Sequence, residues 1–186
     1  MSKLFVKIIL VLAIFISLIN HLSCTESNRT PNTTLELRDS LIYKRGSEIP
    51  FTGREYASIE NKIIEYEVVN GVKHGEFKLY YENGDLEISG NLANNMNEGQ
   101  WQYFYESEQI ESEGNFKDNL PDGIWKWYYR SGNLREEGQF LMGKRFGLWK
   151  QYGELGEVTE EKEFSLSDSL NTGSDHIENL KNNSFQ

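Results

Sequence analysis

The sequence predicts a mostly β protein, a single elongated antiparallel meander built from tandem 24-residue β-hairpin repeats. Two observations support this prediction. Aromatic residues make up 13% of the 186 residues, with 10 Tyr, 10 Phe and 4 Trp, and such side chains favour strands. In addition, glycines recur at an interval of 24 residues, at Gly75, Gly99, Gly123 and Gly147. A fixed period of this kind indicates stacked supersecondary units.

Other columns repeat with the same period. A large ring lies two places after each glycine, at Phe77, Trp101, Trp125 and Trp149. A second glycine follows at Gly90, Gly114 and Gly138. An aromatic stripe lies five places after the first glycine column, at Tyr80, Phe104, Tyr128 and Tyr152. These columns define a repeat array over residues 49–164.

Turn chemistry divides each unit into two strands. In the first full unit we expect strands at 76–81 and 86–92, joined by the sequence ENGD, because Asn-Gly between apolar runs predicts a tight hairpin. Alternation places Leu86, Gly90 and Leu92 on one buried face. A glycine inside a strand is unfavourable unless its space is needed. We therefore expect the Phe or Trp two places into the first strand to stack over it.

Alternation also places the aromatic stripe on the face opposite the tryptophans, which makes Tyr80, Phe104, Tyr128 and Tyr152 the candidate partner-binding residues. The rings on the other face could stack on sugars or seat a partner protein, namely Trp101, Trp125 and Trp149 with Tyr103, Tyr105, Trp127 and Tyr129. The repeats need these rings for their own core, and core packing is the favoured interpretation.

The amino terminus has the features of an export signal. Lys3 and Lys7 precede an apolar run at residues 8–19, followed by Ser23 and Cys24, the single cysteine. This arrangement resembles a bacterial lipobox. The resemblance implies a signal peptide at 1–23, acylation of Cys24 and anchoring in a lipid bilayer. An ordinary cleaved signal and an uncleaved anchor helix over 4–22 are the alternatives, and all three export the rest of the chain.

The remaining segments are polar. Residues 24–48 are expected to be a flexible linker leading into the first strand, and residues 165–186 a disordered tail. Beyond residue 23 the chain has 17 basic and 29 acidic residues, a net charge of about −12, which disfavours nucleic acid as a partner. Five glutamates near the end of the array suggest a charged terminal strand that resists sheet addition, Glu154, Glu157, Glu160, Glu161 and Glu163.

No catalytic constellation is visible in the sequence. After the signal segment the histidines are His74, expected in a turn, and His176, expected in the tail, and no phosphate-loop or nucleophile-elbow motif occurs. We therefore expect a protein that is not an enzyme and that uses no cofactor or metal.

The strings EGNFKDNLPDGIWKWYY, residues 113–129, and EGQFLMGKRFGLWKQY, residues 137–152, resemble MORN repeats of the bacterial variant whose units read G-x-W-x-x-Y-Y-x-x-G-x-L. Members of this variant are often described as YwqK-type antitoxins. The resemblance implies a non-enzymatic scaffold that binds another protein, with a cognate toxin that it neutralises as one such partner. The lipobox in turn favours a location in the cell envelope, facing periplasm or exterior. A carbohydrate or cell-wall binding module that uses the aromatic stripe is the alternative.

Overall fold

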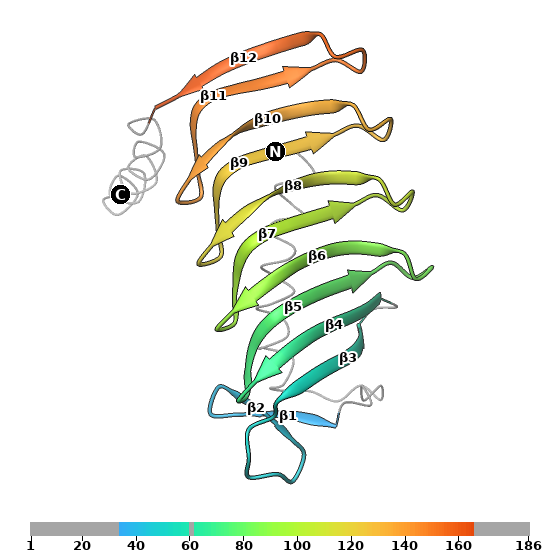
Figure 1. The fold of residues 1–186 in the computed structure, drawn as a ribbon, viewed down its shortest axis with the longest axis vertical. Coiled ribbons are helices and arrows are strands. Elements are labelled where there is room, and N and C mark those ends of the chain that lie inside the picture. The colour runs from blue at the N-terminus through green and yellow to red at the C-terminus, as the bar shows by residue number, and fades with distance from the viewer. Residues whose placement is uncertain (1–33, 60–61, 166–186) are drawn as a thin grey trace, which may run out of the picture.

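A computed structural model describes residues 34–59 and 62–165, and within them the chain is all β (Figure 1). One sheet holds ten antiparallel strands in the order β12-β11-β10-β9-β8-β7-β6-β5-β4-β3, so each strand pairs with its neighbours in sequence. Their bounds are β3 Gly53–Ile59, β4 Lys62–Val69, β5 Val72–Tyr80, β6 Leu86–Ala93, β7 Met96–Phe104, β8 Ile110–Lys117, β9 Leu120–Tyr128, β10 Leu134–Leu141, β11 Lys144–Tyr152 and β12 Val158–Phe164. The predicted antiparallel meander is confirmed.

A separate hairpin precedes the sheet. It consists of β1, Leu35–Arg38, and β2, Leu41–Lys44. The expectation of a flexible linker is wrong for these residues. The two-residue turn at Asp39 and Ser40 has positive φ at both positions, and Ile42 packs against the core of the main sheet. The predicted signal helix, the start of the linker and nearly all of the predicted tail lie outside the described residues.

The turns at one end of the strands are shorter than predicted. Two residues with positive φ join β4 to β5, β6 to β7, β8 to β9 and β10 to β11, namely Asn70–Gly71, Asn94–Asn95, Asp118–Asn119 and Met142–Gly143. Two positive φ angles define the type I′ turn, whose twist matches that of the strands. The first strand of each unit therefore starts earlier than expected, at Val72 instead of residue 76, and His74 lies exposed in β5 and not in a turn.

Side chains of these turns link neighbouring hairpins. The backbone N–H of Lys73 donates to Asn95 Oδ1 at 2.9 Å, and that of Asn97 donates to Asn119 Oδ1 at 2.7 Å. One period later the donor position is Pro121, which has no N–H. The acceptor position there is Gly143, which has no side chain. Donor and acceptor are thus lost together.

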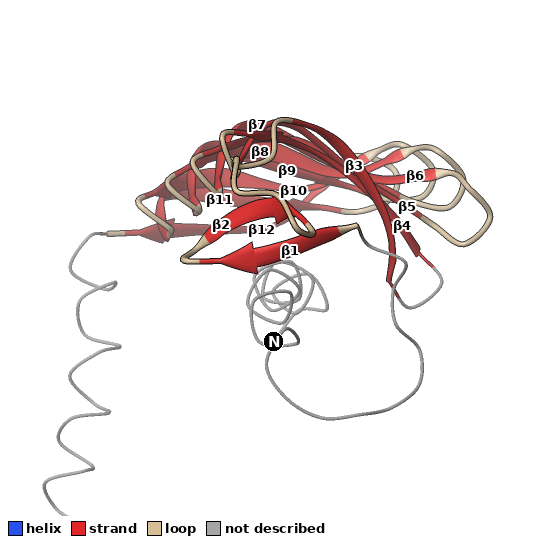
Figure 2. Cartoon of the chain, turned by 90° about the horizontal axis from the view of Figure 1, so that it is seen from below, coloured by secondary structure: helices blue, strands red, loops and turns tan. Residues whose placement is uncertain are grey.

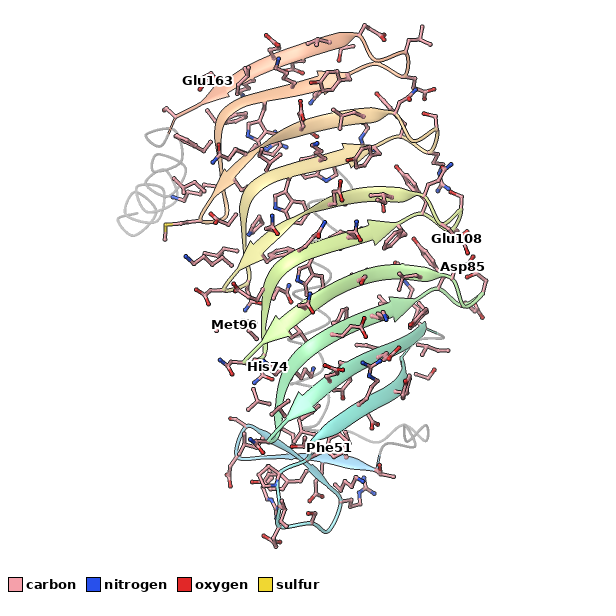
Figure 3. The ribbon with its side chains drawn as sticks, in the orientation of Figure 1. Phe51, His74, Asp85, Met96, Glu108 and Glu163 are labelled. Atoms are coloured by element: carbon pink, nitrogen blue, oxygen red, sulfur yellow. The ribbon has the colours of Figure 1, made fainter. Side chains whose placement is uncertain are left out.

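The loops at the other end of the strands have a different geometry from the one predicted. In the ENGD segment only Gly84 has positive φ, 94°. The backbone N–H of Gly84 donates to Tyr81 O at 3.0 Å, and that of Tyr81 donates to Asp85 O at 2.8 Å. This loop joins β5 to β6 in the hairpin that Asn-Gly predicted, but of that pair only the glycine has positive φ. Glu108 takes the place of this glycine in the next unit, with φ 63°, a region that L residues rarely adopt. Asp85 and Glu108 lie in these loops and are labelled in Figure 3.

The sheet is curved, and the large rings fill one face, which we call the inner face. Figure 2 shows the arch, with the β1–β2 hairpin on its concave side. Ile42 of that hairpin packs against the core cluster, so the inner face is the concave one. Trp101 and Trp125 are fully buried, and Trp149 is 3% exposed. Tryptophans and phenylalanines alternate along this face with ring centroids 5.0–6.2 Å apart, in the order Trp101, Phe116, Trp125, Phe140, Trp149 and Phe164.

The inward glycines carry these rings, as predicted, but the ring comes from the following unit. A Cβ added at Gly90 would overlap Trp101, one at Gly114 would overlap Trp125, and one at Gly138 would overlap Trp149. Each indole N–H also donates to the carbonyl next to its glycine, at 3.0–3.1 Å, on Asn91, Asn115 and Gln139. The expected assignment within one unit missed this, because the register between units skips residues at the bulge beside each glycine.

A bulge also changes the predicted second strand. Leu79 pairs with Ile88 but Tyr80 pairs with Leu86, so one residue of β6 is extra. Ile88, Gly90 and Leu92 form the buried set. Leu86, expected to join them, instead lies opposite Tyr80 and is half-buried.

At both ends of the array, another residue replaces the glycine that carries a tryptophan in the middle units. At the first strand pair the glycine position is Tyr66, and it faces the smaller ring Phe77. At the last strand the glycine position is Lys162, paired with Trp149 on β11. β12 is the edge strand of the sheet, and Glu160, Glu161 and Glu163 are exposed on it as predicted, whereas Glu154 and Glu157 lie in the loop before it. Glu163 is labelled in Figure 3.

Gly114→Ala should destabilise the fold by about 1–3 kcal/mol, because the new methyl group forces the Trp125 ring out of its position. Urea denaturation monitored by circular dichroism measures this. Lys162→Ala is the matched control at the same column, and its effect should stay within about 0.5 kcal/mol. Equal stability of Gly114→Ala and the parent would show that the glycine does not carry the ring.

Candidate interaction surfaces

The aromatic stripe lies where the sequence placed it, on the convex side, which we call the outer face. Tyr80, Phe104, Tyr128 and Tyr152 are all half-buried and end their strands β5, β7, β9 and β11. The tyrosine hydroxyls donate to glutamates on the preceding strand: Tyr80 to Glu65 at 3.0 Å, Tyr128 to Glu113 at 2.8 Å and Tyr152 to Glu137 at 2.7 Å. The stripe is therefore a set of oriented rings whose polar ends are already bonded.

The unit that contains Phe104 lacks the Tyr–Glu hydrogen bond, because both positions of the pair differ. Phe104 has no hydroxyl, and the residue at the glutamate position of that unit is Ser89. A glutamate there would be partly buried without a donor, which is unfavourable. The paired change supports a structural role for each Tyr–Glu bond in the other units.

Ionisation follows these contacts. Burial and the hydrogen bond to Glu113 raise the pKa of Tyr128 to about 12. Burial and the bond to Glu65 likewise raise the pKa of Tyr80. At Tyr152 the hydrogen bond to Glu137 is the larger cause of a raised pKa, ahead of burial. All three hydroxyls are therefore protonated donors at neutral pH.

Exposed aliphatic side chains accompany the stripe on the outer face. Ile124 is 62% exposed and Leu148 46% exposed, two strands apart on β9 and β11. Beside Ile124 lies a shallow hollow of about 260 Å³ over β8, lined by Gln100, Glu113, Gly114, Asn115, Ile124 and Lys126. Exposed apolar groups next to a hollow in a rigid sheet are suited to a protein contact.

A second set of tyrosines, one place further along, fastens the loops. Tyr81, Tyr105 and Tyr129 donate their hydroxyl protons to backbone carbonyls one unit ahead, on Phe104, Tyr128 and Tyr152, at 2.6–2.7 Å. The next position of this column is Gly153. These rings hold neighbouring hairpins together.

Within residues 34–59 and 62–165, three polar atoms on the inner face have no hydrogen-bond partner. They are Tyr103 Oη, Ser112 Oγ and Trp127 Nε1, and their side chains are 1–2% exposed. Tyr103 pairs with Ser112 across β7 and β8, and Ser112 pairs with Trp127 across β8 and β9. Burial raises the pKa of Tyr103 well above its usual value, so its hydroxyl stays protonated.

Sequence reasoning did not single out this trio. It assigned Tyr103 and Trp127 correctly to the core face, but it did not ask which polar atoms of that face lack partners. Ser112 was the available signal, because it is the first polar residue in a column that continues from Ile64 and Ile88 to Glu136 and Glu160.

Other predicted features fall in different places. Cys24 and His176 lie outside the described residues. In residues 34–59 and 62–165, no group of three His, Cys, Asp or Glu side chains is arranged to hold a metal ion. The same residues contain no helix long and apolar enough to cross a membrane.

The fold and its surfaces define a class: a single-layered β-repeat array in which each hairpin contacts its sequence neighbours. Three consecutive segments, residues 73–94, 97–118 and 121–141, match the family described as MORN repeat variant. They coincide with the hairpins β5–β6, β7–β8 and β9–β10. The similarity to this repeat family covers these three central hairpins. No curated protein matches the chain at a significant level.

Tyr128→Phe should destabilise the protein by about 1 kcal/mol, because Glu113 loses a donor while remaining partly buried. Adding Glu113→Ser recreates the combination present at Phe104 and Ser89. The double variant should therefore lose less than the sum of the two single losses, as measured by urea denaturation. Strict additivity would mean that the Tyr–Glu bonds do not couple the strands.

Proposed function

We propose that this protein is a non-enzymatic, membrane-anchored repeat scaffold that binds another protein and acts in a toxin-neutralising, immunity-like role. The observation that carries the proposal is the outer face, where exposed Ile124 and Leu148 lie beside oriented tyrosines. Aromatic rings surrounded by aliphatic groups are typical of the centres of protein interfaces.

Rigidity favours this surface as a binding site. The ring of Tyr128 is held by its bond to Glu113, and Tyr152 by its bond to Glu137. Side chains that are ordered before association lose less conformational entropy on binding. The backbone beneath them is a continuous sheet, so the whole stripe is presented as one preorganised surface.

Charge points to the kind of partner. The whole chain has a net charge of −10. The neighbouring loops that join β5 to β6 and β7 to β8 carry four acids, of which Glu82, Glu106 and Glu108 are exposed and Asp85 is half-buried. A basic protein would be attracted to these acidic loops from a distance, which raises the association rate at low salt.

Anchoring rests on the amino-terminal sequence. Acylation of Cys24 would hold the array at a membrane surface in the cell envelope, because the first described strand, β1, begins soon afterwards at Leu35. Multiple acyl chains give stable attachment, at about 0.8 kcal/mol for each buried CH₂ group.

The protein-binding proposal predicts that the full-length tagged chain, extracted from membranes, returns one protein in stoichiometric amount. Ile124→Asp should reduce this recovery at least tenfold, because it places a charge in the interface. Met142→Asp is the matched control: Met142 is 72% exposed in the turn between β10 and β11, at the opposite end of the strands from the stripe, and recovery should be unchanged. Recovery that is indifferent to Ile124→Asp, or a Trp fluorescence change with cell-wall polysaccharide in place of a protein partner, would favour the glycan alternative.

Cys24→Ser tests the anchor separately. Loss of the thiol prevents thioether formation, so the variant should move from the membrane fraction to the soluble fraction, as followed by immunoblot. Retention in the membrane would indicate an uncleaved anchor helix instead.

A further inference from the structure

The ten-stranded sheet has two edge strands, β12 and β3, and they differ in how they are protected. β12 reads VTEEKEF and exposes three glutamates and Lys162. β3 reads GREYASI and carries two charged residues, Arg54 and Glu55. Charged side chains along an edge strand disfavour the addition of another strand. β12 has this protection along its length, whereas β3 has charges only near its start.

The backbone of β3 is more regular than the rest of the sheet. Its seven residues pair with β4 in one unbroken register, from Gly53 opposite Val68 to Ile59 opposite Lys62. Every other strand pair that the structure describes in this sheet contains a bulge. Bulges twist an edge away from an incoming strand. In a regular antiparallel strand, alternate residues turn their N–H and C=O groups away from the paired strand. β3 therefore presents an even row of donors and acceptors on its free side.

The charge of Arg54 is directed toward the sheet. On the outer face its guanidinium donates to Glu65 at 2.6 Å and to Glu67 at 2.5 Å, and it forms an ion pair with Glu76 at 3.2 Å. These glutamates belong to β4 and β5. The side chain is therefore held over the neighbouring strands and not along the free side of β3. Tyr56, on the same face of β3, is 61% exposed.

The β1–β2 hairpin does not pair with β3. The backbone N–H of Ile42 donates to Gly71 O at 2.9 Å, and that of Phe51 donates to Ile42 O at 2.8 Å, so the hairpin is tied to the chain before β3 and to the turn after β4. It lies on the concave side of the sheet (Figure 2). Within residues 34–59 and 62–165, β3 pairs with β4 alone, at the lower end of the sheet in Figure 1. The other side of β3 has no neighbouring strand among these residues.

Two side chains on the inner face of β3 determine what an added strand would contact. Ala57 is half-buried against the core and is the smallest member of a cross-strand row with Ile64 and Leu79. A large apolar side chain beside it would extend this row. Glu55 is also half-buried; burial raises its pKa, and the nearby ammonium of Lys44 lowers it. A basic side chain beside Glu55 would stabilise its carboxylate.

We propose that β3 is a docking edge for one β-strand of a partner protein, which pairs antiparallel with Gly53–Ile59 and places a large apolar side chain beside Ala57 and a basic side chain beside Glu55. Main-chain hydrogen bonds would supply affinity and these two positions selectivity. In an antiparallel pair the residue opposite Ala57 precedes the one opposite Glu55. The partner strand thus contains a large apolar residue followed two places later by Lys or Arg. The inference rests on the proposed protein-binding function and adds a contact separate from Ile124 on β9.

A strand from a second copy of this chain fits the edge less well. A symmetric antiparallel pair of β3 strands centred on Tyr56 would put Glu55 opposite Ala57 and not opposite a basic residue. The β12 strand of a second copy would bring its glutamates next to Glu55. Each chain also has a net charge of −10, which opposes the association of two copies.

The test uses the full-length chain in the cells that produce it. A photoreactive benzoylphenylalanine replaces Tyr56, and matched variants carry it at Val158 on the acidic edge and at Leu148 on the outer face. These side chains are 61%, 49% and 46% exposed, so all three probes reach solvent. Mass spectrometry identifies the adducts after illumination. We expect the Tyr56 position to join a peptide of another protein that has the apolar and basic residues two places apart, and the Val158 position to join none.

Ser58→Pro separates strand pairing from a side-chain contact. Two residues separate Ile59 from Lys62, and the pair that flanks a two-residue hairpin loop is hydrogen-bonded. Alternation then directs the N–H of Ser58 to the free side of β3. Proline removes this donor and leaves the bonds to β4 in place. It should lower the adduct yield at Tyr56 about three- to tenfold, whereas Ser58→Ala, which keeps the N–H, should leave the yield unchanged.

Melting temperatures keep this result separate from misfolding. Ser58→Pro should melt within a few degrees of the parent, because proline is tolerated on an edge strand where the N–H faces solvent. If it melts lower, Ala57→Lys replaces it as the blocking variant, since an inward-facing charge prevents strand addition. Thr159→Lys, on β12, is the matched control and should leave the adduct at Tyr56 unchanged.

The remaining outcomes overturn the inference. They are an adduct at Tyr56 with a glycan, with an acyl chain, with this chain's own residues or with a second copy, no adduct at all, a yield indifferent to the blocking variant, or a yield lowered equally by Ser58→Ala. If Leu148 joins a partner while Tyr56 fails in one of these ways, protein binding stands and the docking edge is wrong. If neither position joins a protein, both the proposed function and this inference fail.

Discussion

The packing of an indole ring over a glycine backbone is the interaction on which the array depends. Trp101, Trp125 and Trp149 each cover a glycine of the preceding unit and donate the indole N–H to the carbonyl beside it. The ring thus contributes both apolar contact and a satisfied hydrogen bond across the boundary between units. Because the described array is a single layer over most of its length, this contact takes the place of the second sheet that would cover the core in a sandwich.

The two faces of the sheet differ in how completely their polar groups are satisfied. On the outer face, Tyr128 and Glu113 bond one another, and the unit that lacks the tyrosine hydroxyl also lacks the glutamate. On the inner face, the hydroxyl of Ser112 has no hydrogen-bond partner in the part of the chain that the structure describes. A protein can keep an unsatisfied buried group where a function requires it, at some loss of stability. The outer face therefore contributes structure and exposed contact area, while the inner face retains unused hydrogen-bonding capacity.

Much of the architecture could be predicted from the sequence because the period of 24 residues is explicit in the glycine and aromatic columns. Alternation placed Tyr80 and Trp101 on opposite faces correctly. What failed depended on register between strands. The bulge beside Gly114 places the Trp125 ring of the next unit over this glycine, and the repeat pattern in the sequence does not reveal a bulge. The turn geometry was predicted less well. Asn-Gly at Asn83 marks a hairpin that the structure confirms, but the two-residue turns lie at pairs such as Asp118–Asn119. The trio around Ser112 required knowledge of which polar atoms lack partners, which only coordinates provide.

Lys162 and Gly153 have a consequence for the length of the molecule. A further hairpin would need a glycine where Lys162 stands, to receive its tryptophan, and a tyrosine where Gly153 stands, to reach its carbonyl. Both are absent from the last described unit, and the strand that carries Lys162 is lined with glutamates. The last described strand therefore lacks the residues on which an added hairpin would pack. Neither another repeat nor a second molecule finds the contacts it would need to extend it.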